Sequence, residues 1–161
     1  MNQQKLLLFV ALLLFLQACG KVTYTKENSA LIVFKTPTFK YADMGFIYEN
    51  PKEVKAEIYG NGKAIMSLRI SESAVCMSLF ECMNKESFNQ TILTNAYPKE
   101  ILENIFKGKA IFHAKNIRKI RNGFTQKIIN KNKYNIDYRV LNNEIIFRDT
   151  INAILIKIKK Q

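Results

Sequence analysis

The chain contains no tryptophan and one histidine among 161 residues, with six glycines, three prolines and three cysteines. The histidine, His113, has no acidic neighbour in the sequence, whereas a serine or cysteine nucleophile needs a suitably held base. We find no glycine-rich phosphate loop, no HExxH and no GxSxG pattern. Cys76, Cys82 and His113 form a poor ligand set for a metal. We therefore expect no enzyme activity, no metal and no other cofactor.

Acidic residues are also scarce. The chain has 13 Asp and Glu against 25 Lys and Arg, a formal net charge of +12 at pH 7. Such a charge favours nucleic acid or anionic lipid and glycolipid as partners. The most basic stretch, from Lys107 to Lys133, contains no acid. Two interpretations of it stay open, a lipid-facing surface and an ordinary solvated one.

The chain opens with a long apolar run, from Leu6 to Leu16 behind Lys5. Eleven residues make a helix of roughly 16 Å, short of the ~20 residues that cross a bilayer. The segment Leu16-Gln17-Ala18-Cys19 follows, and it has the leucine, small residue and cysteine of a bacterial lipobox. We predict that residues 1–18 are a cleaved signal peptide and that Cys19 becomes an acylated N-terminus.

Several acyl chains on Cys19 would make the membrane a stable partner. Gly20 follows the cysteine, and among lipoproteins sorted by this position a residue other than Asp favours the outer membrane. We expect the domain to face the periplasm, so nucleic acid is not a partner. The alternative is an ordinary secreted protein in which Cys19 is incidental.

The remaining cysteines, Cys76 and Cys82, are a candidate disulfide in an oxidising compartment. In one straight strand they would lie about 20 Å apart, well beyond the ~7 Å limit between bonded Cα positions. A bond therefore requires a bend through 78–80. The alternative is two small buried hydrophobic residues.

Residues 21–29 are polar, so we expect a tether over 19–29 and a single domain over 30–161. Alternating apolar and polar residues predict strands in the first half of the domain and again near its end. The expected strands cover 30–34, 39–48, 54–59, 63–70, 74–80, 123–129, 134–141, 144–148 and 152–159. Gly60-Asn61-Gly62 suits a tight hairpin turn.

Two helices are expected between these groups of strands. One begins at Asn84 or Ser87 and runs to Leu93. The other follows Pro98, with Ile101, Leu102, Ile105 and Phe106 on one stripe and Gly108 at its end. The fold class is α+β, a mostly antiparallel sheet with two helices inserted between its halves.

This order of elements resembles the LolA/LolB group of periplasmic lipoprotein carriers and receptors. The resemblance rests on Val54 to Leu68 with its Gly-Asn-Gly turn, on 97–108, on Gly123-Phe124-Thr125, on 134–138 and on 154–159. It implies a curved sheet forming an incomplete β-barrel, with the two helices on its concave face around an acyl-binding cavity. The LolB-like receptors also carry an exposed leucine on a loop between early strands, where this chain has Gly60-Asn61-Gly62.

From this we expect an outer-membrane lipoprotein that binds acyl chains and assists lipoprotein or lipid localisation, with a periplasmic carrier protein as a possible partner. The candidate lining residues, chosen from inward strand phases and the helix stripe, are Phe46, Tyr48, Ile58, Met66, Leu68, Ile101, Ile105 and Phe106. The alternative is a structural or adaptor lipoprotein with a filled core that docks another envelope protein.

Overall fold

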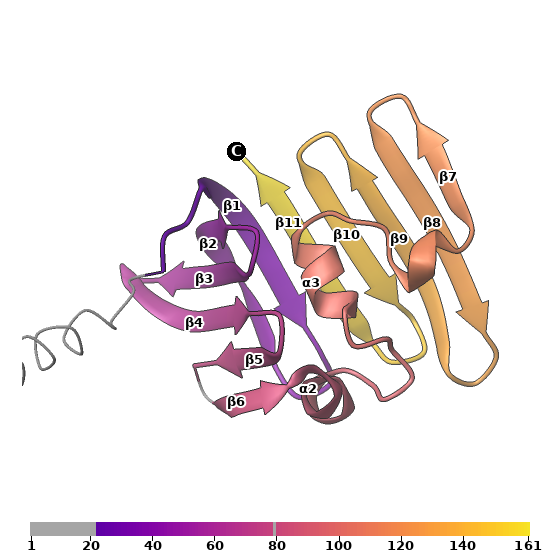
Figure 1. The fold of residues 1–161 in the computed structure, drawn as a ribbon, viewed down its shortest axis with the longest axis horizontal. Coiled ribbons are helices and arrows are strands. Elements are labelled where there is room, and N and C mark those ends of the chain that lie inside the picture. The colour runs from indigo at the N-terminus through magenta and orange to yellow at the C-terminus, as the bar shows by residue number, and fades with distance from the viewer. Residues whose placement is uncertain (1–21, 79) are drawn as a thin grey trace, which may run out of the picture.

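The computed structural model describes residues 22–78 and 80–161 (Figure 1). The strands are β1 (Lys26–Lys35), β2 (Lys40–Glu49), β3 (Val54–Gly60), β4 (Lys63–Ile70), β5 (Ala74–Met77), β6 (Phe80–Asn84), β7 (Ile117–Ile120), β8 (Gly123–Asn130), β9 (Tyr134–Leu141), β10 (Glu144–Asp149) and β11 (Ile154–Lys160). The helices are α2 (Lys85–Ile92), α3 (Ile101–Phe106) and the short 3-10 turn η1 (Phe112–Ala114). The predicted signal peptide and Cys19 lie outside the described residues.

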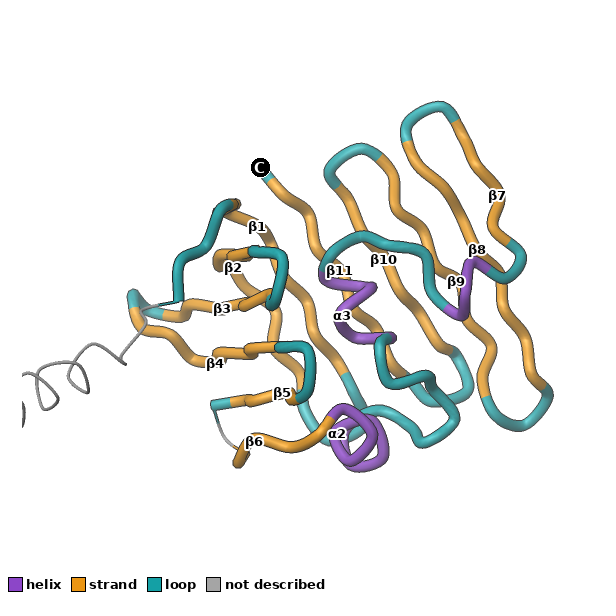
Figure 2. The backbone as a smooth tube through the Cα atoms, viewed as in Figure 1, coloured by secondary structure: helices purple, strands orange, loops and turns teal. Residues whose placement is uncertain are grey.

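The strands form one curved, open sheet of 11 strands in the order β6-β5-β4-β3-β2-β1-β11-β10-β9-β8-β7, with antiparallel pairings throughout. The first six strands run outward from the centre to one edge. The chain then crosses to the other edge, and the last five strands return until β11 pairs with β1. The crossover carries α2, α3 and η1 past one face of the sheet (Figure 2). We call residues 85–116 the cover.

Side-chain alternation gives the sheet an inner face toward the cover and an outer face away from it. On β1, for example, Ile32 and Phe34 are fully buried while Leu31 is 37% exposed. The inner-face side chains of the strands pack with the apolar stripe of α3 and with Phe88 and Ile92 of α2 into a single core. The stripe predicted for the second helix is therefore confirmed.

Asparagine and glycine close several of the hairpins. Asn61 and Gly62 have φ of 51° and 75°, and Asn132 and Asn142 have φ of 66° and 52°. Positive φ is tolerated by glycine and asparagine better than by other residues, and it matches the twist of two-residue hairpin turns. The predicted Gly-Asn-Gly hairpin is present between β3 and β4.

Three details differ from the sequence prediction. β1 begins at Lys26, so the end of the expected tether is already paired in the sheet. The expected strand over 74–80 is divided into β5 and β6. β7 was not predicted at all. It is an edge strand with only β8 beside it, so it need not show the alternation of a half-buried strand.

Gly45 on β2 offers a stability test. Its register partner is Ile58, and a Cβ at this position would lie 1.9 Å from the Glu57 carbonyl oxygen. We expect Gly45→Val to lower the free energy of unfolding by about 3 kcal/mol or more, because β2 and β3 would have to separate. Urea denaturation would measure this. Ala42→Val, an exposed position on the same strand, is the control and should change stability by less than about 0.5 kcal/mol.

Candidate functional site

Six of the eight predicted lining residues meet in the interior. Ile58, Met66 and Leu68 lie on the inner face of β3 and β4, and the α3 residues are part of the same core cluster. All six have 0% of their surface exposed. The set is Ile58, Met66, Leu68, Ile101, Ile105 and Phe106.

The strand phase predicted for Phe46 and Tyr48 is wrong. Phe46 lies opposite Glu57 and Tyr48 opposite Lys55, whereas buried Ile47 lies opposite Ala56. Directly opposed residues share a face of the sheet, so the two aromatic residues are on the outer face. Gly45 occupies the inward position beside them. Because glycine has no apolar side chain, the sequence pattern does not show that residues 45 and 47 are the ones that face inward.

In this conformation the predicted lining is a filled core. A void that admitted even one water molecule would leave accessible surface on the side chains around it, and these six have none. Five hollows on the described surface have volumes of about 150–390 Å³ and are lined by other residues. An acyl chain could therefore reach these side chains only if the cover moved.

The cover is held to the sheet at Tyr97. Its hydroxyl donates to Oδ2 of Asp149 at 2.5 Å, and Asp149 is only 1% exposed. Asp149 also accepts from the backbone amides of Asn135 and Ile151, each at 3.0 Å, and from Nδ2 of Asn152 at 2.6 Å. Burial alone would raise the pKa of the Asp149 carboxyl, but these donors outweigh it and hold the pKa below its usual range. Burial and the contact with Asp149 raise the pKa of Tyr97.

A second link joins the two helices of the cover. Glu103 of α3 accepts from Nζ of Lys85 at 2.6 Å and from Nζ of Lys107 at 2.7 Å. The side chains of both lysines are more than nine-tenths buried. Burial works against the Glu103 carboxylate, yet the two ammonium groups keep its pKa lowered.

A third link fixes the end of the cover to β8 and β9. The Gln126 side chain accepts from the Ile111 amide at 2.8 Å and donates to the carbonyls of Ile111 and Lys115 at 3.0 and 2.8 Å. The Tyr138 hydroxyl donates to the Lys109 carbonyl at 2.9 Å, and burial raises its pKa. These contacts satisfy the backbone of a segment that has little regular structure of its own.

The outer face carries an aromatic cluster near the start of the described chain. The ring of Tyr48 lies 5.5 Å from that of Tyr24 and 6.1 Å from that of Phe46, and Phe46 also contacts Tyr59 at 5.9 Å. Lys55 lies 5.3 Å above the Tyr48 ring. Tyr24 donates to Glu53 at 2.5 Å, and burial with this contact raises its pKa. The residues just before β1 are thus packed against the domain.

Cations outnumber acids on this outer face along β1–β4 and β7–β11. Alternation and register place there Lys35, Lys40, Lys55, Arg69, Arg118, Lys127, Arg139, Arg148, Lys157 and Lys159, and the acids Glu27, Glu57, Asp137 and Glu144. Hydrogen bonding to Lys157 lowers the pKa of Glu144. The basic stretch 107–133 is divided between the end of α3, η1, the β7–β8 hairpin and the β8–β9 turn, so its charges do not form one face.

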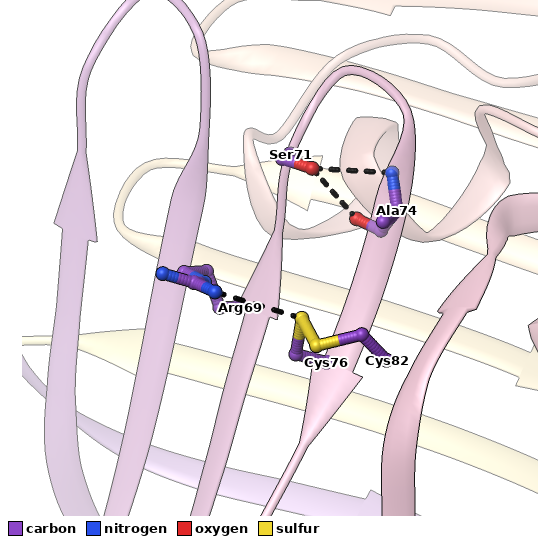
Figure 3. Close-up of a disulfide and its surroundings, with 5 residues drawn as sticks. All are labelled: Arg69, Ser71, Ala74, Cys76 and Cys82. Carbon is purple, nitrogen blue, oxygen red and sulfur yellow. Dashed lines mark hydrogen bonds between the residues drawn. A yellow bond between two sulfur atoms is a disulfide. The ribbon is translucent and has the colours of Figure 1, made fainter.

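The cysteine pair forms a disulfide between β5 and β6 (Figure 3). The Cα atoms of Cys76 and Cys82 are 4.1 Å apart, because β5 ends at Met77 and β6 begins at Phe80. Nη2 of Arg69 lies 3.7 Å from the Cys76 sulfur. The disulfide closes the hairpin at the free edge of the sheet, on the outer face.

Within residues 22–78 and 80–161, no three His, Cys, Asp or Glu side chains are grouped so that they could hold a metal ion. His113 is exposed and lies in η1, with φ of 53°. Among the same residues, no helix has the length and apolar character needed to cross a membrane.

Comparison with family models and with curated protein sequences finds no match to this chain.

Proposed function

We propose that this protein is a lipoprotein held at the outer membrane by acyl chains on Cys19, and that it acts by docking another envelope protein. The filled interior carries this proposal. The cover is fixed to the sheet at Asp149 and Gln126, and its two helices are joined at Glu103. In this conformation the interior is closed to a partner, whereas the outer face and the sheet edges are open to one. A periplasmic carrier protein is one candidate partner.

The start of the described chain determines how close the domain would lie to the bilayer. Val22 is three residues after Cys19 in the sequence, a span of about 10 Å at full extension. Thr23 and Tyr24 are already bonded to Asn50 and Glu53 of the domain. An acylated Cys19 would therefore hold the domain directly against the bilayer, with almost no free tether.

A test of the anchor uses Cys19→Ala. We expect the wild-type chain to incorporate labelled palmitate and the variant to lose the label completely, because the thiol is the acceptor of the lipid. Intact-mass measurement of the mature protein is the readout. Gln17→Ala, at the least restricted position of the lipobox, is the control and should stay labelled. A mature wild-type protein with no added acyl mass would contradict the anchor.

Acyl-chain binding in a LolB-like half-barrel is the second candidate function, and the convergence of six predicted lining residues between the sheet and α3 favours it. Each CH₂ buried there would contribute about 0.8 kcal/mol. Access requires the cover to move away from β10. The cavity would then lie between α3 and the concave inner face.

Native mass spectrometry distinguishes the two candidates. An amount of co-purified lipid or lipopeptide that increases in Tyr97→Phe, because the link to Asp149 is lost, would support acyl binding. A stable protein partner, with an amount of bound lipid that is unchanged in Tyr97→Phe, would support docking.

A further inference from the structure

A polar hollow lies at the end of the sheet where the described chain begins. Its volume is about 340 Å³, and it is formed by the start of β1, the β2–β3 turn and the end of α3. Its polar lining includes Thr25, Lys26, Glu49, Asn50, Lys107 and Lys109. We call it the end hollow.

The charges around the end hollow leave an excess of positive charge. Glu49 is paired with Lys160 at 2.7 Å. Lys107 shares the single carboxylate of Glu103 with Lys85, so this trio keeps one net positive charge. Lys26 and Lys109 are exposed and form no ion pair with any other residue of the described chain.

The end of α3 places Lys107 and Lys109 at this hollow. Gly108 adopts φ of 63°, which ends the helix. The amide of Lys109 donates to the Asn104 carbonyl at 2.8 Å and the amide of Gly108 to the Ile105 carbonyl at 3.1 Å. The carbonyls of Asn104 and Ile105 are thus satisfied internally and do not need a ligand that donates hydrogen bonds.

The hollow also adjoins the path toward Cys19. Asn50, part of its lining, donates from Nδ2 to the Thr23 carbonyl at 3.1 Å. A second hollow of about 390 Å³ shares Thr25, Asn50 and Pro51 with it and extends to Val22. If Cys19 is acylated, as proposed above, the end hollow lies at the level of the lipid head groups.

From this juxtaposition we propose that the end hollow binds the phosphate of an anionic lipid head group. Lysine ammonium groups act as point charges for phosphate, and the volume accommodates a phosphate with a small polar substituent. The site fixes which end of the sheet rests on the bilayer. The edges and the outer face then stand free for a protein partner.

The test uses the full chain with its native N-terminus, held in nanodiscs of phosphatidylcholine and phosphatidylglycerol. Native mass spectrometry counts the phosphatidylglycerol retained on the protein, with and without millimolar inorganic phosphate as competitor. The test variant is Lys26→Gln with Lys109→Gln. The control is Lys131→Gln with Lys133→Gln, which removes the same charge from the β8–β9 turn at the opposite end of the sheet.

We expect retention of phosphatidylglycerol to fall about thirtyfold in the test variant, because each of its two lysines contributes about 1 kcal/mol near an anionic surface, and to stay unchanged in the control. Displacement by inorganic phosphate would show that the phosphate group alone is recognised. Resistance to it would show that the whole lipid head group is recognised. An equal fall in both variants, or no retention by the wild type, would overturn the proposal. The same spectra report the acyl mass on Cys19, so a failed anchor is seen separately.

Discussion

Asp149→Ala should lower the free energy of unfolding by about 3 kcal/mol or more. The substitution removes the acceptor for the Tyr97 hydroxyl, for two backbone amides at 3.0 Å and for the Asn152 side chain. Buried donors left without an acceptor cost about 1–3 kcal/mol each. The variant also frees the middle of the cover from β10. Urea denaturation followed by circular dichroism would measure the loss.

Asp137→Ala is the matched control, because it removes a carboxylate from an exposed outer-face position of the neighbouring strand. We expect it to change stability by less than about 0.5 kcal/mol. If both alanine variants were equally stable, Asp149 would have no special role in holding the cover.

The stabilisation from Asp149 should also depend on pH. The folded-state pKa of this carboxyl is lowered, so its contribution is present above the unfolded value of about 3.9 and is lost as pH falls through the folded value. We expect the difference in stability between wild type and Asp149→Asn to shrink steadily below about pH 4. A difference that grew on acidification would contradict this sign.

The regular part of the fold could be predicted because most strands have one buried face. Alternation such as Ile154, Ile156 and Ile158 against Lys157 and Lys159 reports that face directly. Alternation gives no signal where a strand has no buried face. In edge strand β7, Ile117 is partly buried and the other three residues are exposed.

The polar links of the cover could not be predicted from local patterns. Tyr97 and Asp149 are 52 residues apart, Lys85 and Glu103 are 18 apart, and Gln126 is 15 residues from Ile111. In the sequence these residues resemble ordinary surface polar residues. Their burial depends on the crossover that carries the chain from β6 to β7, which no short motif encodes.

The sequence also could not show whether the predicted acyl site is an open cavity or a filled core. Hydrophobic periodicity identifies which side chains face inward, and it placed six of the eight correctly. It cannot tell whether facing side chains leave space between them, because a filled core and a lined cavity use the same residues. That difference depends on how closely α3 approaches β10, and it is visible only in three dimensions.

Glu103→Ala should be the other strongly destabilising substitution, with a loss of about 3–5 kcal/mol. It would leave the Lys85 and Lys107 ammonium groups, with side chains 7% and 8% exposed, facing each other without their shared carboxylate. Removing one partner of a buried ion pair leaves an uncompensated charge, which costs about this much. Lys85 also lies at the first position of α2, where a positive charge opposes the helix dipole.

Two further variants separate the charge effect from lost packing. Adding Lys85→Met and Lys107→Met to Glu103→Ala should recover most of the stability, because the triple variant has no buried charge. Glu100→Ala, next to the same helix, is the control: Glu100 is 3.9 Å from Lys99 and both side chains are about half exposed, so the loss should stay below about 1 kcal/mol. A triple variant no more stable than Glu103→Ala would show that the loss of stability comes from packing and not from the uncompensated charges of Lys85 and Lys107.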